Sequence, residues 1–403
     1  FIREKFHTTP VVKKFLNKFT DLDPNYRKNL IMNFFVNSAF FGLPYQREKS
    51  EELGVEVPWT ILIDPTSNCN LNCRGCWAAK YSGETMEFET LDRIITEAKE
   101  ELGIHFIIFS GGEPTTYPHL FDICEKHDDV GFMMFTNGTL IDAEMADKMV
   151  EVGNLTPAIS LEGDEANTDH RRSSGTYNQI MEAMDRLEER GIVFGASLTF
   201  TRNNVEDILG DDQFIDHLVE KGVSYLWGFH YIPIGENPDL DLMLTPKQRQ
   251  MTARRISQLR TEKPIFMIDF WNDGPFTEGC IAGGKNYFHI NAQGDVEPCA
   301  FVHFAADNIK NKSLVEAIQN PLFKSYQKRQ PFNDNYLLPC PIIDNPEALG
   351  DMVEEAGAYP THPGAEGILK SEVTAELKET AAQWEELSPE LSEEENKSVS
   401  ESA

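Results

Sequence analysis

The chain has little positive charge for its length and no hydrophobic run long enough to span a membrane. Its 403 residues include 36 Lys and Arg against 66 Asp and Glu, which gives a formal net charge of −30. Nucleic-acid backbones and anionic membranes select for basic proteins, so this balance argues against either as the main partner. A transmembrane helix needs about 20 consecutive apolar residues, and no such run occurs. We therefore expect a globular protein of two or three domains in the cytoplasm.

Cysteine is also scarce, and it is unevenly distributed. There are seven cysteines, an odd number, and three of them fall between positions 69 and 76. A disulfide framework places an even number of cysteines along a short secreted chain, whereas crowded cysteines in a long chain favour a reducing compartment. The chain begins at Phe1 rather than Met, so the sequence does not say whether a leader precedes it.

The crowded cysteines lie in the stretch Asp64–Trp77, with C-x3-C-x2-C spacing, after the apolar run Trp59–Ile63. Three thiolates on a strand-exit loop can converge on one metal centre, because thiolates are soft ligands for zinc and for iron–sulfur clusters. A structural zinc site needs a fourth ligand nearby, and the next histidine, His105, is a strand away. A [4Fe–4S] cluster held by three cysteines instead leaves one iron open to a ligand. The three residues are Cys69, Cys73 and Cys76.

A second ligand-binding segment follows about 35 residues later. The apolar run His105–Phe109 ends in Ser110-Gly-Gly-Glu-Pro114. Glycines let backbone groups approach a ligand closely, and Glu113 adds a carboxylate. A zinc knuckle and an ordinary Gly-Gly turn would give the same letters, but the order of the two segments at two strand ends favours a shared site.

In this order, the two segments resemble the radical S-adenosylmethionine (radical SAM) superfamily, over roughly Pro58 to Gly235 and more weakly to Cys340. The resemblance implies that the three cysteines hold a [4Fe–4S] cluster whose open iron chelates the amino and carboxylate groups of S-adenosylmethionine. Reductive cleavage would then give methionine and a 5′-deoxyadenosyl radical, which takes hydrogen from the substrate. One departure is Gly75, because family members often have an aromatic residue before the third cysteine. The segment that would contact the methionine amino group comprises Gly111, Gly112, Glu113 and Pro114.

Residues 1–57 predict a helical preface whose apolar stretch, 29–41, packs on the main domain; a membrane-surface or partner-binding helix is the alternative. From Pro58, near-continuous apolar strands alternate with helices and predict an α/β fold with a parallel sheet. The resemblance selects a partial (β/α)6 TIM-like barrel. The expected strands are 59–64, 105–110, 131–136, 156–161, 193–200 and 225–231, with a further run at 264–271. The expected helices include 88–102, 143–152, 177–190, 205–221 and 245–260.

Polar residues recur where the expected strands end, which is the active-site face of a barrel. Ser160 and Glu162 alternate along the fourth strand and would point the same way. The resemblance implies that both contact the cofactor, that Arg172 meets its carboxylate, and that Ile234 and Gly235 contact adenine. Solvated strand ends would explain the same residues without a function. Candidates on the fifth strand and its exit are Ser197, Thr199 and Asn203.

After Gly274 the sequence changes to a Gly-rich loop, a hairpin turn at 291–295 and a short helix near 313–318. With Gly294 five residues before Cys299, the order resembles SPASM or twitch extensions, which hold auxiliary [4Fe–4S] clusters. The paired spacings of a full SPASM domain are absent, so we expect one auxiliary cluster with an open or non-cysteine fourth position; free buried cysteines are the alternative. Cys124 is expected in the core. The auxiliary candidates are Cys280, Cys299 and Cys340.

These patterns divide the chain into four expected segments. They are a helical N-terminal segment (1–57), a radical SAM core barrel (58–262), an auxiliary-cluster extension (263–345) and an acidic tail, largely helical or disordered (346–403), which includes Glu393–Glu395.

The resemblance implies an enzyme, but the sequence does not identify its substrate. Auxiliary-cluster members often act on peptides, so a peptide is favoured. A lipid or small metabolite is the alternative substrate, and its only support is the apolar preface at Phe34 and Phe35. A non-catalytic metal-binding scaffold is the alternative of another class, and the GGEP segment argues against it. The expected partners are the substrate and an electron donor such as flavodoxin or ferredoxin.

Overall fold

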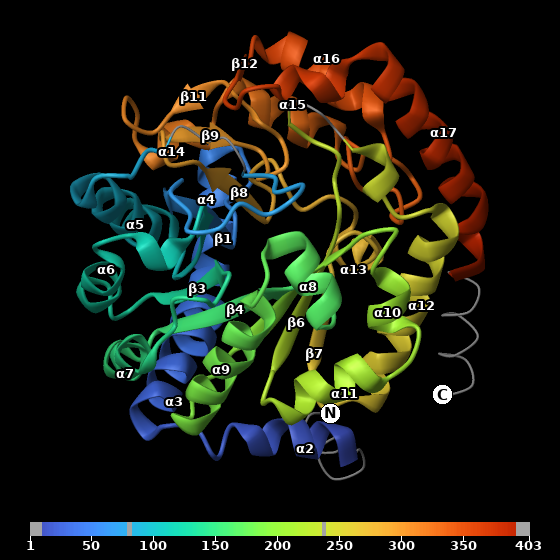
Figure 1. The fold of residues 1–403 in the computed structure, drawn as a ribbon. Coiled ribbons are helices and arrows are strands. Elements are labelled where there is room, and N and C mark those ends of the chain that lie inside the picture. Colours follow the sequence, from blue (N-terminus) through green and yellow to red (C-terminus); the bar gives the residue numbers. More distant parts are fainter. Residues whose placement is uncertain (1–9, 79–82, 236–238, 392–403) are drawn as a thin grey trace.

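The computed structural model describes residues 10–78, 83–235 and 239–391. Six parallel strands alternate with helices, as the sequence predicts (Figure 1). The strands are β1 (Thr60–Thr66), β2 (Phe106–Gly111), β3 (Gly131–Thr136), β4 (Leu155–Leu161), β5 (Gly195–Phe200) and β6 (Tyr225–His230). The helical segments between them are α5 (Phe88–Leu102), η2 (Pro114–Thr116), α6 (Leu120–Lys126), α7 (Ala143–Val152), α8 (Glu165–Arg172), α9 (Thr176–Glu189), α10 (Val205–Leu209) and α11 (Gln213–Glu220).

The outer helices follow their hydrophobic spacing. In α5, for example, Leu91, Ile94, Ile95, Ala98 and Leu102 face the sheet and are fully buried, as expected for apolar residues three and four apart. The helix ends at Gly103, which adopts a left-handed φ of 69° that favours glycine. The single helix expected at 205–221 is two helices, because the chain turns at 210–212.

The sheet continues beyond these six strands at both edges. β7 (Phe266–Asp269) adds to β6, while β8 (Tyr287–Ile290) pairs with β1, again in parallel. β9 (Asp295–Glu297) and β11 (Asp307–Asn308) then extend the β8 edge in antiparallel pairings. The described strands therefore form one open ten-stranded sheet in the order β11-β9-β8-β1-β2-β3-β4-β5-β6-β7, which confirms a partial barrel. The connections before β8 are η3 (Leu240–Leu242), α12 (Pro246–Glu262) and α13 (Gly274–Thr277).

Aromatic side chains bridge the gap between the β7 and β8 ends of the barrel. The ring centroid of Phe270 lies 6.0 Å from that of Tyr287, and Trp271 and Phe229 lie 5.4 Å and 6.5 Å from Phe301. Such pairs contribute about 0.5–1.5 kcal/mol each beyond the area they bury. Side-chain packing thus joins two strands that share no hydrogen bonds.

The N-terminal helices lie at the amino ends of the parallel strands, with α2 and α3 at the bottom of Figure 1. In the π-type helix η1, the side-chain amides of Asn33 and Asn37 donate to the carbonyls of Asp128 (2.8 Å) and Asp129 (3.0 Å). One face of η1 therefore packs on the barrel, as the sequence favours. The elements are α2 (Pro10–Lys18), α3 (Pro24–Leu30), η1 (Ile31–Gly42) and α4 (Leu43–Leu53).

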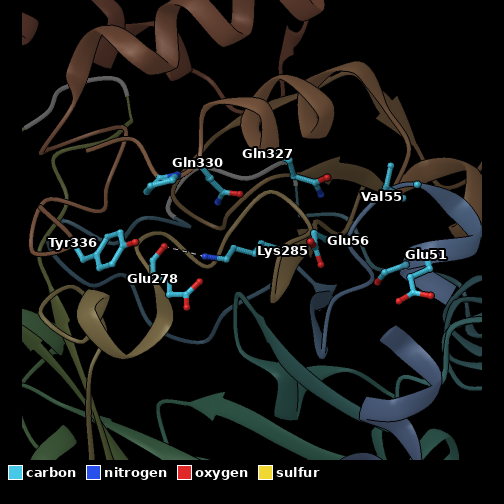
Figure 2. A pocket seen from close by; sticks show the side chains of 11 residues that line it. Glu51, Val55, Glu56, Glu278, Lys285, Gln327, Gln330 and Tyr336 are labelled. Carbon is cyan, nitrogen blue, oxygen red and sulfur yellow. Dashed lines mark hydrogen bonds between the residues drawn. The ribbon is translucent and has the colours of Figure 1, made fainter. Parts of the chain in front are cut away.

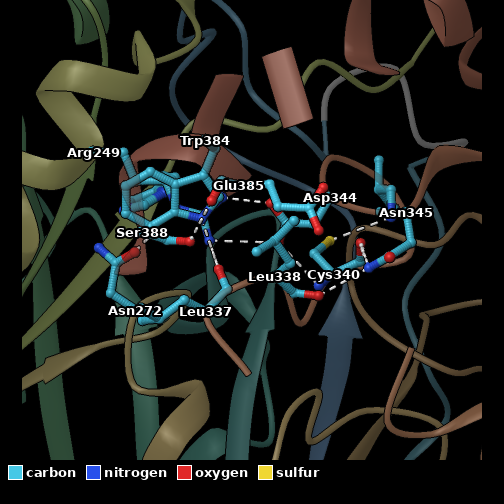
Figure 3. A network of polar contacts seen from close by, with 12 residues as sticks. Arg249, Asn272, Leu337, Leu338, Cys340, Asp344, Asn345, Trp384, Glu385 and Ser388 are labelled. Atoms are coloured by element: carbon cyan, nitrogen blue, oxygen red, sulfur yellow. Dashed lines mark hydrogen bonds and ion pairs between the residues drawn. The ribbon is translucent and has the colours of Figure 1, made fainter. Parts of the chain in front are cut away.

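The C-terminal part covers the upper end of the barrel and runs down its side (Figure 1). Helix α17 packs on α12 through Trp384, which is 1% exposed and donates its indole N–H to the carbonyl of Leu337 (2.8 Å). Figure 3 shows Arg249 beside this ring and paired with Asp344, four residues after Cys340. The elements here are β10 (Phe304–Ala305), α14 (Leu314–Ala317), α15 (Pro321–Arg329), α16 (Pro346–Ala356), β12 (Tyr359–Pro360), η4 (Ala365–Leu369) and α17 (Ser371–Leu387).

Within the described ranges, every helix is too short or too polar to cross a membrane. The sequence-based expectations for residues 1–9 and for Glu393–Glu395 fall outside the described residues.

Candidate active site

A cavity of about 360 Å³ lies at the carboxyl ends of the parallel strands. Its volume is within the range of small-molecule sites. The structure brings together there many of the residues that the sequence singles out: Cys69, Cys73, Cys76, Gly111, Gly112, Glu113, Ser160, Arg172, Ser197 and Thr199.

Other predicted residues lie outside this lining. Pro114 is buried, and Asn203 is exposed. Ile234 is partly buried, and its neighbour Ile232, two residues earlier, lines the cavity instead. The adenine contact of Ile234 stays a prediction; the chain lines the cavity from His230, where β6 ends, to Ile232.

The cysteine loop is held by the end of α8. The backbone N–H of Arg74 donates to the carbonyl of Arg171 (2.9 Å), and the Arg171 side chain donates back to the carbonyl of Arg74 (3.1 Å). Gly75, the departure from the family pattern, has a left-handed φ of 65°, and a Cβ atom there would lie 3.0 Å from the Tyr231 ring. The loop therefore needs glycine, since Tyr231 occupies the adjacent space.

A buried carboxylate organises the same wall. Glu162 is 1% exposed and accepts hydrogen bonds from Arg172 through Nε (2.9 Å) and Nη2 (2.6 Å). Nη1 of Arg171 lies 2.6 Å from the other carboxylate oxygen. Both guanidinium groups line the cavity, whereas Glu162 lies behind them. Two cations on one anion leave a net positive charge at this wall, which suits a ligand carboxylate.

The GGEP segment crosses the end of β1 at very short range. The N–H of Glu113 donates to the carbonyl of Asn68 (2.8 Å), and a Cβ atom at Gly112 would lie 2.1 Å from that carbonyl oxygen. The Glu113 carboxylate accepts from the hydroxyl of Thr136 (2.6 Å) and the N–H of Asn137 (2.7 Å). Burial raises the pKa of Glu113, and these hydrogen bonds oppose the rise. Glu113 thus ties the ends of β2 and β3 together.

The second group of cysteines lies beside the same cavity, around the buried tyrosines Tyr287 and Tyr326. The phenol of Tyr287 donates to the sulfur of Cys299 (2.7 Å), and Tyr287 itself lines the cavity. Burial raises the pKa of the Cys299 thiol to about 11. Burial also raises the pKa of Cys280, as do charges on its two neighbouring thiols. Three thiols therefore gather in one apolar place. They belong to Cys280, Cys299 and Cys340. Cys124, by contrast, belongs to α6 and is buried in the core.

A buried ionic network links the two cysteine groups, and sequence reasoning missed it. His289 on β8 lies between Asp64 at the end of β1 (3.0 Å) and Glu297 on β9 (2.5 Å). All three side chains are 0–2% exposed. Asp64 precedes Cys69 by five residues, and Glu297 precedes Cys299 by two. The sequence contains one signal for this network: polar side chains interrupt otherwise apolar strands. That signal is weak, because the sequence does not show that β1 and β8 are paired.

Comparison with known proteins matches this arrangement to two families. Residues 63–215 match the family described as the radical SAM superfamily, and residues 280–354 match SPASM, described as an iron–sulfur cluster-binding domain. Together the two matches cover more than half of the chain. The chain belongs to the radical SAM superfamily. It is an enzyme of that superfamily with a SPASM domain, and its cofactors are a [4Fe–4S] cluster, S-adenosylmethionine and auxiliary iron–sulfur.

The relatives of this radical SAM enzyme are named for different products. The AdoMet-dependent heme synthase of Methanosarcina barkeri is 25% identical over 66% of the chain and 83% of that protein. The mycofactocin maturase MftC of Mycobacterium tuberculosis is 27% identical over 67% of the chain and 75% of that protein. Streptococcus suis SuiB, solved with its precursor peptide SuiA, shares the fold with a TM-score of 0.60, at 18% identity over 73% of each chain.

The residues of the radical SAM site fit a cluster better than a single metal ion. Among the described residues, no three His, Cys, Asp or Glu side chains are grouped as one ion requires. A zinc ion holds its thiolates about 2.3 Å away on all sides, whereas a [4Fe–4S] cluster is wider and spaces its cysteines farther apart. The donors of both cysteine groups are thiols, which iron–sulfur clusters take.

A further pocket, of about 510 Å³, lies between the loop after α4 and the start of the SPASM domain (Figure 2). Lys285 crosses it, but its ammonium group donates to the carbonyls of Thr277 (2.9 Å) and Glu278 (3.0 Å). Gln330 donates to the carbonyls of Cys280 and Ala282. Because these polar groups are already engaged in holding the Cys280 loop, we assign the pocket a structural role.

Replacing Gly112 with alanine should destabilise the radical SAM enzyme. The new Cβ atom would overlap the carbonyl oxygen of Asn68, a backbone atom that cannot move aside without shifting the cysteine loop. We expect a loss of about 1–3 kcal/mol in the free energy of unfolding, as for other forced overlaps, measured by urea denaturation. Gly350→Ala is the control, since that glycine is helical with open space around it, and alanine there should stabilise by about 0.4–1 kcal/mol. Equal responses of the two variants would contradict the close approach.

Stability should fall as the pH rises from about 6.5 to about 10, because of His289. Burial alone would lower the pKa of His289, but the carboxylates of Asp64 and Glu297 outweigh it and raise the pKa to about 10. The folded state then holds a proton that the unfolded state releases near pH 6.5, so this contribution is complete below pH 6.5 and lost through pH 10. We expect the difference in unfolding free energy between wild type and His289→Gln to shrink over that range. A constant gap for His289→Gln would refute the protonated state.

Proposed function

We propose that Cys69, Cys73 and Cys76 hold the [4Fe–4S] cluster and that S-adenosylmethionine lies in the same cavity, against the GGEP segment, Ser160 and Arg172. Hydrogen is then taken from a substrate that occupies the rest of the cavity. One observation carries this proposal. A single cavity is lined on one side by the three thiols and the GGEP segment, and on the other by residues beside the second cysteine group.

The protein's own residues supply position and shielding in this reaction. When bound, the reduced cluster provides the electron that splits the C5′–S bond of the cofactor. Glycine at 112 lets the GGEP backbone pass directly against the carbonyl of Asn68, which holds this segment beside the cysteine loop. The positive wall of Arg171 and Arg172, steadied by Glu162, is suited to the methionine carboxylate. The aromatic lining on the far side excludes water from the reacting carbon.

We assign the auxiliary iron–sulfur of the SPASM domain to Cys280, Cys299 and Cys340, with a fourth position not filled by cysteine. The gathering of three buried thiols around Tyr287 supports this assignment. The external partner that the reaction requires is a one-electron donor, of the flavodoxin or ferredoxin type.

The sequence favours a peptide substrate, and the likeness to mycofactocin maturase is its support. The likeness to heme synthase is of similar strength and concerns a different product. Similarity alone therefore does not select a substrate class, and the lining of the cavity has to decide between them.

Anaerobic reconstitution with iron and sulfide tests the proposed function. Wild-type protein, reduced with dithionite in the presence of S-adenosylmethionine, should release 5′-deoxyadenosine and methionine in equal amounts. Changing Cys280, Cys299 and Cys340 together to alanine should remove part of the bound iron and sulfide but not all of it. A protein that takes up zinc in place of iron, or that holds a cluster and never cleaves the cofactor, would overturn the proposal.

A further inference from the structure

The active-site cavity has two chemically different halves. The half at the strand ends carries the thiols, the GGEP backbone and the two arginines. The other half is aromatic, and its rings contact one another across the barrel: the Phe135 ring lies 5.8 Å from Trp227 and 5.6 Å from Phe229. Seven side chains make up this aromatic half: Trp59, Phe135, Trp227, Phe229, Phe270, Tyr287 and Phe301.

Several polar groups beside these rings are turned to the protein. The hydroxyl of Tyr287 donates to Cys299, that of Thr60 to the carbonyl of Phe106 (2.8 Å), and that of Thr277 to the carbonyl of Gly279 (2.9 Å). The indole N–H of Trp59 donates to Ser38 (3.0 Å). A substrate in this half therefore gains mainly apolar contact, with the hydroxyl groups of Ser197 and Thr199 on β5 beside Trp227 and Phe229.

This distribution discriminates between substrate classes. A buried peptide backbone brings an N–H and a C=O with each residue, and leaving such groups unpaired costs about 1–3 kcal/mol each by protein mutational data. A substrate with several carboxylates needs several cations, but Arg171 and Arg172 already share Glu162. The cavity is also near the lower end of the usual volume range, and the cofactor must share it. A hydrocarbon chain is narrow and needs no polar partner.

An exposed apolar surface outside the cavity also favours a hydrocarbon substrate. Among the described residues, eleven large hydrophobic side chains are exposed, and six of them fall in the short stretch 31–45 of η1 and α4. Large exposed apolar patches mark sites of interaction with proteins, ligands or membranes. The six are Ile31, Met32, Phe35, Phe40, Phe41 and Tyr45, with Phe40 the most exposed at 71%.

The charge around this patch fits an anionic bilayer. Residues 10–49 contain seven Lys and Arg against three Asp and Glu, in a chain whose net charge is −30. Arg27 and Lys28 precede the apolar patch and Arg47 follows it, whereas Lys49 pairs with Glu52 (2.6 Å). A helix that combines exposed phenylalanines with nearby Lys and Arg lies in the interface of anionic membranes. Within residues 10–49 the balance of charge is therefore the reverse of that of the whole chain.

The two features are joined by direct ring contacts. The ring of the exposed Phe35 lies 5.2 Å from that of Phe34, and Phe34 lies 5.9 Å from Trp59, which lines the cavity. We propose that the aromatic half of the cavity binds the hydrocarbon chain of a membrane lipid, and that the apolar face of η1 rests on the bilayer which supplies it. This inference rests on the proposed function and names its substrate class.

Vesicle sedimentation tests the membrane contact without any cofactor. Wild-type protein should pellet with vesicles of equal parts phosphatidylglycerol and phosphatidylcholine, and less with phosphatidylcholine alone. The variant Phe35→Asp/Phe40→Asp/Phe41→Asp should bind at least tenfold more weakly. Phe276→Asp, at an equally exposed phenylalanine outside this face, should bind like wild type. Wild-type protein that stays in the supernatant, or a control variant that loses binding equally, would overturn the contact.

Deuterium transfer tests the substrate class. Reconstituted enzyme, dithionite and S-adenosylmethionine are mixed with vesicles whose lipids carry perdeuterated acyl chains. One C–D bond of the chain breaks and one C–D bond forms at the 5′ carbon, so the 5′-deoxyadenosine should gain one mass unit. Unlabelled 5′-deoxyadenosine would overturn the lipid inference, leave the proposed function standing and return the choice to a peptide. No 5′-deoxyadenosine at all would overturn the proposed function and this inference with it.

Discussion

The triple variant Cys69→Ala/Cys73→Ala/Cys76→Ala should release no 5′-deoxyadenosine above background. The three thiols line one cavity with the GGEP segment, and cleavage needs an electron delivered at that place. Enzymes accelerate their reactions by at least about 10⁶-fold, so loss of the proposed cluster site takes the rate below detection. The measurement is 5′-deoxyadenosine by liquid chromatography and mass spectrometry, with iron and sulfide counted on the same samples.

Cys124→Ala is the matched control for that variant. Cys124 is fully buried in the core and remote from both cysteine groups, so its loss should lower stability slightly and leave cleavage intact. Iron that remains in the triple variant would be held by the SPASM cysteines. Cleavage that survives in the triple variant would show that the cluster assignment is wrong, whatever its iron content.

Glu162→Gln should cost about 3–5 kcal/mol of unfolding free energy, the cost of breaking a buried ion pair on one side. The substitution keeps the shape of the side chain but leaves the guanidinium groups of Arg171 and Arg172 without their shared carboxylate. Loss of the ion pair should also loosen the cysteine loop, because Arg171 exchanges two hydrogen bonds with Arg74. Urea denaturation measures the first effect, and affinity for S-adenosylmethionine measures the second.

Glu144→Gln provides the comparison for this prediction. Glu144 also pairs with a cation, Lys148, but its side chain is 78% exposed, and exposed pairs contribute at most about 1 kcal/mol. The expected ranking is therefore a large loss for Glu162→Gln and a negligible one for Glu144→Gln. Losses of similar size would mean that Arg171 and Arg172 are not held by Glu162.

Local patterns were enough to predict the elements of the barrel. Helices 88–102 and 143–152 and strand 131–136 have the predicted bounds, because each combines a clear hydrophobic period with a terminating glycine or a turn. Thr245, the first residue of the predicted helix 245–260, forms a full capping box with Gln248 at the start of α12. These features depend on residues a few positions apart, so the sequence contains all the necessary information.

Contacts between distant segments were beyond the same reasoning. The sequence suggested Arg172 for the cofactor carboxylate but could not show that Glu162 engages it. The network of Asp64, His289 and Glu297 depends on the pairing of β1 with β8, more than 200 residues apart. The apolar stretch 29–41 was correctly expected to pack on the barrel, yet only the structure separates the packed Phe34 from the exposed Phe35.

The parallel pairing of β8 with β1 has a mechanical consequence. Leu62 lies opposite His289 in a shared hydrogen-bond ladder, so the barrel and the SPASM domain have no hinge between them at this point. Neighbouring strands are held about 4.8 Å apart, which fixes the spacing between the two cysteine-bearing regions during turnover. A chain cut after residue 262 would leave β1 with a bare edge, the kind of surface that recruits other strands and aggregates. The barrel and the SPASM domain therefore cannot swing apart at this edge without breaking that ladder.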